Sequence, residues 1–115
     1  MTIEKIMADI AQFTEERDWG QFHTHKDLAI ALSVEASELL EIFMFRTNEE
    51  IEEGIEGTED AILEEIADVM IYALMMCQKM DCDPLAAIAW KMAKNRIKYP
   101  VEKAKGSNKK YTDIS

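Results

Sequence analysis

Apolar side chains recur every three or four residues along most of this chain, which is the spacing of amphipathic helices. The first such stretch runs from about Ile3 to Asp18 and is interrupted around Gly20. The second begins after Thr24, a candidate helix N-cap with Asp27 three residues further on, and continues to about Arg46. The pattern therefore predicts two helices in the first 46 residues.

An acidic segment, residues 47–59, separates these stretches from the next apolar one. Its low apolar content and two glycines predict a mobile loop that can include one helical turn. A third helix is expected to start at Thr58 or Asp60 and to continue to about Met80.

A fourth helix is predicted from Pro84 to about Lys98, because proline suits the first helical position. A basic and polar tail, residues 100–115, follows. This tail could be partly disordered or could be ordered by packing of Tyr111. Four helices with short connections predict an all-α, four-helix bundle-like protomer, and 115 residues are the size of the single domain, 1–115, that we expect.

Composition narrows the function classes. The chain carries 23 Asp and Glu residues against 13 Lys and Arg residues, which gives a net charge of -10. This excess of negative charge disfavours binding to a nucleic acid polymer. No apolar run reaches the roughly 18 residues of a membrane span, and we expect no membrane association. Cys77 and Cys82 match neither a zinc pattern nor a disulfide framework, so we expect reduced thiols and a cytoplasmic protein.

Two acid pairs interrupt the apolar faces of the second and third helices. On a helical wheel four apolar residues fall within about 40° of Glu35, namely Leu28, Ala31, Leu39 and Ile42, and Glu38 lies about 60° away. Glu65 and Asp68 repeat this arrangement on the third helix. Since residues three apart on a helix are neighbours, each pair can converge on one point in the core.

Clustered carboxylates in a core need compensation, because two like charges about 4 Å apart repel by roughly 4 kcal/mol at an effective dielectric near 20. They could take up protons, form ion pairs with Arg17, Lys91 or Arg96, or hold a divalent cation. Two inward pairs at equal spacing favour the cation, and a site made of oxygen ligands favours Mg²⁺ over zinc.

Lys91, Asn95 and Lys98 form a polar stripe on the fourth helix. The stripe is either a solvated flank or a phosphate-binding surface in which Lys supplies charge and Asn supplies hydrogen-bond donors. A magnesium site together with such a surface would suit a nucleoside triphosphate.

These residues and their surroundings resemble the all-α NTP pyrophosphatases of the MazG-like superfamily, and in particular the dCTP pyrophosphatase branch. The family pattern is Glu-x-x-Glu on one helix and Glu-x-x-Asp on the next, here Glu35–Glu38 and Glu65–Asp68. The resemblance extends over nearly the whole chain, in order, through the segments ERDWGQFH, ASELLEIF, EEIADVMIY, KMAKNRIKYP and KKYT.

The resemblance implies hydrolysis between the α and β phosphates of a nucleotide to a monophosphate and pyrophosphate, with dCTP or a modified dCTP as the expected substrate. It implies that the four acids bind Mg²⁺ and carry the catalysis. It also implies substrate contacts for six residues: Trp19, His23, Phe45, Tyr72, Lys91 and Asn95. Without the family, Trp19 and Tyr72 would equally be core aromatics and His23 a helix-entry residue.

One residue departs from the family pattern, because Phe45 stands where relatives carry Trp. Phenylalanine stacks more weakly and has no N–H donor, which affects the expected base preference rather than the reaction. The family further implies a homodimer or homotetramer. Apolar residues on several sides of the second and third helices agree with such an assembly.

Two alternative functions remain open from the sequence. One is a non-catalytic helical module that binds nucleotides or proteins, with its acids held in ion pairs. The other is a related pyrophosphohydrolase that acts on a different nucleotide, such as a histidine-pathway nucleotide or dUTP.

Overall fold

The computed structural model describes residues 1–54, 57–110 and 112, which form helices and contain no strand. The elements in chain order are α1 (Ile3–Glu16), the 3₁₀ helix η1 (Gly20–Phe22), α2 (His25–Phe43), α3 (Asn48–Gly54), α4 (Glu59–Lys79), α5 (Pro84–Lys98) and α6 (Val101–Ala104). The prediction of an all-α fold is confirmed.

Side-chain caps explain where α2 and α5 start. The backbone N–H of Asp27 donates to Thr24 Oγ1 at 3.1 Å, which fixes the start of α2. Asp83 Oδ1 accepts from the backbone N–H of Leu85 at 3.0 Å, with Pro84 in the first turn of α5. Both starts agree with the sequence-based expectation.

The segment between α2 and α4 is more helical than expected. The second helix ends at Phe43 rather than near Arg46, and Phe45 has a left-handed backbone with φ of 65°. Thr47 then caps α3 by accepting from the backbone N–H of Glu50 at 3.1 Å. This cap, with acidic side chains at the positive helix end, supports seven helical residues instead of a single turn.

The tail also contains a short helix, α6, which the sequence pattern did not predict. The carbonyl of Pro100 accepts from the N–H groups of Lys103 and Ala104 at 3.0 and 2.9 Å. Tyr111, the residue expected to order the tail, lies outside the described residues.

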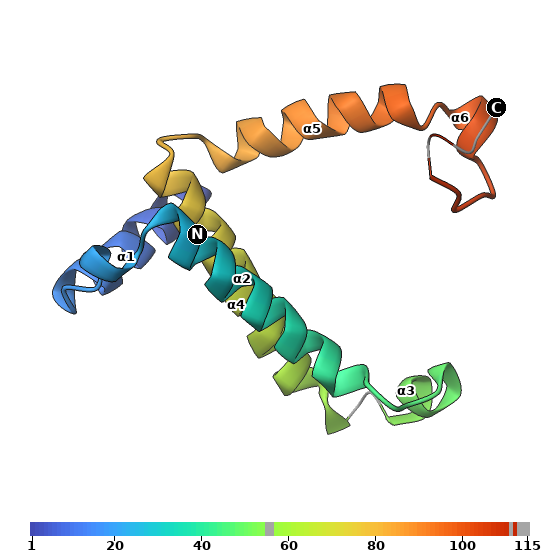
Figure 1. Ribbon diagram of the computed structural model, residues 1–115, viewed down its shortest axis with the longest axis horizontal. Helices are drawn as coiled ribbons and strands as arrows, with labels where there is room; N and C mark the ends of the chain where they lie inside the picture. The colour runs from blue at the N-terminus through green and yellow to red at the C-terminus, as the bar shows by residue number, and fades with distance from the viewer. Residues whose placement is uncertain (55–56, 111, 113–115) are drawn as a thin grey trace. The chain divides into compact units, whose positions relative to one another are not determined.

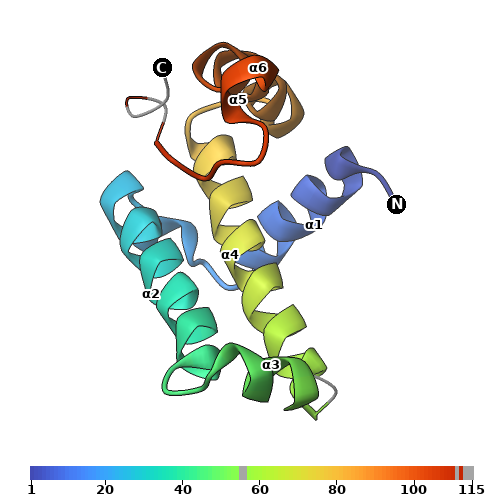
Figure 2. The same ribbon diagram turned by 90° about the vertical axis from the view of Figure 1, so that its right-hand side faces the viewer.

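The described residues form two compact units, Met1–Asp81 and Cys82–Ser115. In the first unit α2 and α4 run antiparallel, side by side, and share the most extensive helix–helix contact (Figures 1 and 2). The α1 helix crosses the C-terminal half of α4, where Gln78 Nε2 donates to the carbonyl of Met7 at 2.6 Å. The second unit consists of α5 and α6. The single domain 1–115 stays a prediction.

The first unit buries little apolar surface by itself. Its buried apolar side chains among the described residues are Ile10 and Leu28. Large apolar side chains on α2 and α4 are about half exposed or more: Ile30, Val34, Leu40, Leu63 and Met70. Apolar faces of this extent mark interaction surfaces rather than ordinary solvent-facing helices.

Two further expectations concern compartment and membrane. Neither Cys77 nor Cys82 forms a disulfide among the described residues. Over the part of the chain that the structure describes, no helix combines the length and apolarity that a membrane span requires.

Candidate active site

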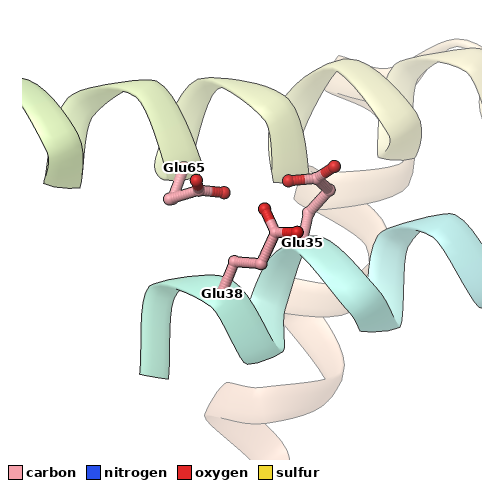
Figure 3. A group of neighbouring side chains, drawn as sticks. All are labelled: Glu35, Glu38 and Glu65. Atoms are coloured by element: carbon pink, nitrogen blue, oxygen red, sulfur yellow. The ribbon is translucent and has the colours of Figure 1, made fainter. Parts of the chain in front are cut away.

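Three glutamates meet between α2 and α4. Glu35 and Glu38 extend from α2 and Glu65 extends from α4 into a shared space (Figure 3). One carboxylate oxygen from each of the three lies within 4.8 Å of the others, and all three side chains are half-buried. We call this set the acidic cluster. It forms because the two antiparallel helices place their acid-bearing faces against each other.

The acidic cluster is electrostatically unsatisfied. Burial raises the pKa of Glu35 to about 7, with further contributions from hydrogen bonding to Glu65 and Glu38 and from the charges of Glu38 and Asp68. Burial also raises the pKa of Glu65. Within the described residues, the Oε2 atoms of Glu35 and Glu65 are buried and have no hydrogen-bond partner. Such orphaned carboxylate oxygens are costly unless a ligand satisfies them.

Among the described residues of Met1–Asp81, no ion pair joins a basic side chain to these acids. The ion pair described in Met1–Asp81 joins Arg17 to Glu16, with Arg17 Nη1 and Glu16 Oε2 at 3.8 Å. The Arg17 guanidinium also lies 3.7 Å from the centre of the Phe13 ring. Arg17, a candidate ion-pair partner in the sequence, is therefore engaged elsewhere.

Asp68, the fourth predicted ligand, is adjacent to the acidic cluster rather than part of its closest group. Its charge raises the pKa values of Glu35 and Glu65, which places it at the edge of the same site. The structure thus brings three of the four predicted acids together and sets the fourth beside them.

The donor set of the cluster fits a hard divalent cation. It offers only carboxylate oxygens, which are the ligands that Mg²⁺ prefers, and no thiolate or imidazole. A cation at this point would contact the two orphaned oxygens and offset the mutual repulsion of the glutamates. A divalent metal is therefore the occupant that this chemistry supports.

A cavity of about 260 Å³ adjoins the acidic cluster through Asp68 and contains three of the predicted substrate-binding residues: Trp19, His23 and Tyr72. Burial, followed by the charges of Glu35, Asp68 and Glu38, raises the pKa of Tyr72. Tyr72 therefore lines the cavity and at the same time lies close enough to the acidic cluster to be affected by its charges. We call this the aromatic cavity.

The aromatic cavity also contains residues that the sequence did not single out. Asp9 and Phe13 line it from α1. The Phe13 and Trp19 rings meet edge to face, with centroids 5.7 Å apart and planes 75° apart. Asp9 and Phe13 are four residues apart on one helix, a spacing that could have placed them on a common face. That spacing, however, does not show which part of the fold this face of α1 packs against.

The other three predicted substrate-binding residues are Phe45, Lys91 and Asn95. Phe45 is 97% exposed and lines neither the aromatic cavity nor a second cavity of about 440 Å³ between α1 and the C-terminal end of α4. Lys91 and Asn95 belong to α5, in the second unit. The charge of Lys98, followed by burial, lowers the pKa of Lys91, so basic side chains do gather on α5. Roles for these three in substrate binding stay predictions.

Comparison with known proteins agrees with the family that the sequence motifs resemble. The sequence model of the MazG-like family matches residues 30–114. The chain belongs to the MazG-like family. It is 39% identical to human dCTP pyrophosphatase 1 and 37% identical to the bovine protein of that name, in each case over 98% of this chain and 68% of the relative.

A solved structure shows the same fold. A pyrophosphatase from Archaeoglobus fulgidus DSM 4304 superposes with a TM-score of 0.81 and 40% sequence identity, covering 85% of this chain and 92% of that one. The family predicted from the sequence motifs is therefore confirmed by both sequence and structural similarity.

Proposed function

We propose that this protein is a Mg²⁺-dependent nucleoside triphosphate pyrophosphohydrolase that cleaves the bond between the α and β phosphates, with dCTP or a modified dCTP as substrate. The observation that carries the proposal is the acidic cluster with its two buried, unpartnered carboxylate oxygens beside an aromatic cavity. The similarity to proteins named dCTP pyrophosphatase 1 supports the choice of nucleotide.

In this proposal the acids hold the metal: Glu35, Glu38, Glu65 and Asp68. Bound Mg²⁺ would neutralise and align the phosphates and would acidify a water molecule. The chain contributes ligand oxygens from two packed helices, which fix the site without mobile loops. Asp68 lies both beside the cluster and in the aromatic cavity, so it joins the metal end of the site to the nucleoside end.

The aromatic cavity would receive the nucleoside. Trp19 offers a face or edge for base stacking, and its position is supported by Phe13. His23 and Tyr72 supply hydrogen-bonding groups in the same cavity. The proposal keeps phosphate contacts for Lys91 and Asn95 of α5 and a base contact for Phe45, although Phe45 does not line the aromatic cavity.

The direct test is incubation of the purified chain with Mg²⁺ and a panel of dNTPs, followed by separate assays of pyrophosphate and orthophosphate. We expect pyrophosphate and dCMP from dCTP. Orthophosphate with dCDP would contradict cleavage at the proposed bond. Release of neither product, together with nucleotide binding, would favour a non-catalytic module. A higher kcat/KM for dUTP than for dCTP would indicate the related enzyme of different specificity.

We also propose that the chain forms a homodimer or homotetramer, in the cytoplasm. The exposed apolar side chains of α2 and α4 support an interface there, because a protomer with so little buried surface gains stability by covering them. Light scattering on the wild type should give two or four chain masses. Met70→Glu, which places a charge on a side chain that is 55% exposed, should reduce that mass, whereas Glu64→Gln should not.

A further inference from the structure

One carboxylate in the aromatic cavity has no role in the proposed reaction. Asp9 lines the cavity from α1. Among the described residues no hydrogen bond or ion pair involves the Asp9 side chain, which is exposed to solvent. The other carboxylate of the cavity, Asp68, influences Glu35 and Glu65 and so belongs to the metal end. Asp9 is therefore the carboxylate that remains available to a ligand in this cavity.

The position of Asp9 indicates which part of a ligand it would meet. Asp9 precedes Phe13 by four residues on α1, so the two side chains are neighbours on the helix surface. Phe13 in turn contacts Trp19, the aromatic residue best suited to stack on a base. A base stacked on Trp19 would present its polar edge to the cavity lining, where Asp9 is the carboxylate that does not belong to the metal site.

An ionised carboxylate only accepts hydrogen bonds. Cytosine carries an amino group at C4, which donates, and Asp or Glu is a recognised acceptor for it. Uracil and thymine carry a carbonyl oxygen at C4, which also only accepts. A carboxylate facing that oxygen would leave both groups unpaired and would disfavour the base.

We propose that Asp9 is a specificity-determining residue that accepts a hydrogen bond from the 4-amino group of a pyrimidine base and rejects 4-oxo pyrimidines. The proposal rests on the proposed function, because it takes the base of that substrate to occupy the aromatic cavity. It assigns base selection to an acid on α1, away from the glutamates of the acidic cluster.

The test compares kcat/KM for dCTP and dUTP in the wild type, Asp9→Asn and Asp9→Leu. The amide of Asp9→Asn can donate to a 4-oxo group, so the dCTP-to-dUTP ratio should fall at least tenfold, which corresponds to about 1.4 kcal/mol. Asp9→Leu should lose activity on dCTP without a gain on dUTP. Glu4→Gln removes an acid from the same helix outside the cavity and should leave the ratio unchanged.

A second measurement separates this inference from the proposed function. If the wild type releases pyrophosphate and neither Asp9 variant changes the ratio, the role of Asp9 is wrong and the reaction stands. If the wild type hydrolyses no nucleotide, the reaction is wrong, and calorimetric titration with dCMP and dUMP decides the role of Asp9. Tighter binding of dCMP that Asp9→Asn abolishes supports the role, and equal affinities for the two nucleotides overturn it.

Discussion

The acidic cluster on α2 and α4 and the basic side chains of α5 are two groups of like-charged side chains whose pKa shifts have different main causes. We call Lys91, Lys94 and Lys98 the lysine stripe. In the acidic cluster, burial is the largest cause of the raised pKa of Glu35. In the lysine stripe, the charge of Lys98 is the largest cause of the lowered pKa of Lys91, followed by burial.

This difference reflects how each site is built. The acidic cluster exists because two helices pack, and it therefore combines desolvation with repulsion. The lysine stripe arises on a single helix from spacings of three and four residues. A desolvated anionic site suits a compact divalent cation, whereas lysines along one helix suit an extended polyphosphate that stays partly hydrated.

The largest expected effect comes from breaking the acidic cluster. Glu38→Gln removes a ligand charge with little change in shape, and we expect kcat for dCTP to fall on the order of 10²–10³-fold, the usual scale for loss of one electrostatic contact in a reacting site. The melting temperature should stay constant or rise, because one repulsive charge is lost. Steady-state kinetics and thermal melting measure the two effects.

Glu41→Gln is the matched control, since Glu41 is an exposed acid three residues further along α2. Its kcat should equal that of the wild type. Equal losses in both variants, or a loss in Glu38→Gln that follows unfolding, would contradict a metal-binding role for the cluster.

A smaller effect is expected from the lysine stripe. Lys91→Met keeps the length of the side chain and removes its charge, so KM for dCTP should rise about tenfold, equivalent to about 1.4 kcal/mol, with a smaller change in kcat. Lys5→Met, on exposed α1 surface, provides the control. An unchanged KM in Lys91→Met would indicate that the stripe is only a solvated flank.

The smallest expected effect is a shift in melting temperature with pH. It measures the ionisation of the acidic cluster and does not depend on catalysis. Folding raises the pKa of Glu35 from 4.5 to about 7, so its protonated form stabilises the fold. In the absence of metal this stabilisation is complete below about pH 4.5 and is lost as the pH rises through about 7. The metal-free melting temperature should therefore decrease over that range, and less so in Glu35→Gln.

Mg²⁺ should reverse this dependence, because it requires ionised ligands and stabilises the folded state by mass action. The increase in melting temperature caused by Mg²⁺ should grow from pH 5 to pH 8. Glu35→Gln should reduce that increase at every pH. A Mg²⁺ effect that is independent of pH, or equal in the variant, would count against binding at the cluster.

The sequence predicted the parts of the site that depend on one helix at a time. The spacing of Glu35 and Glu38 placed both on the face that meets α4, and the capping residue Thr24 fixed where α2 starts. The acidic loop was less well predicted, because the seven-residue helix α3 depends on a local cap at Thr47 within a polar segment that lacks apolar periodicity.

The sequence by itself determined the four longer helices, α1, α2, α4 and α5, together with the two inward acid pairs and the family, because all of these are encoded in short-range spacing and local motifs. Only the tertiary structure decided which acids meet, that Asp68 stands beside the closest group, and that Asp9 and Phe13 share a cavity with Trp19. These relations depend on how α1, α2 and α4 cross, and helix periodicity fixes the face a residue occupies but not the partner that face meets.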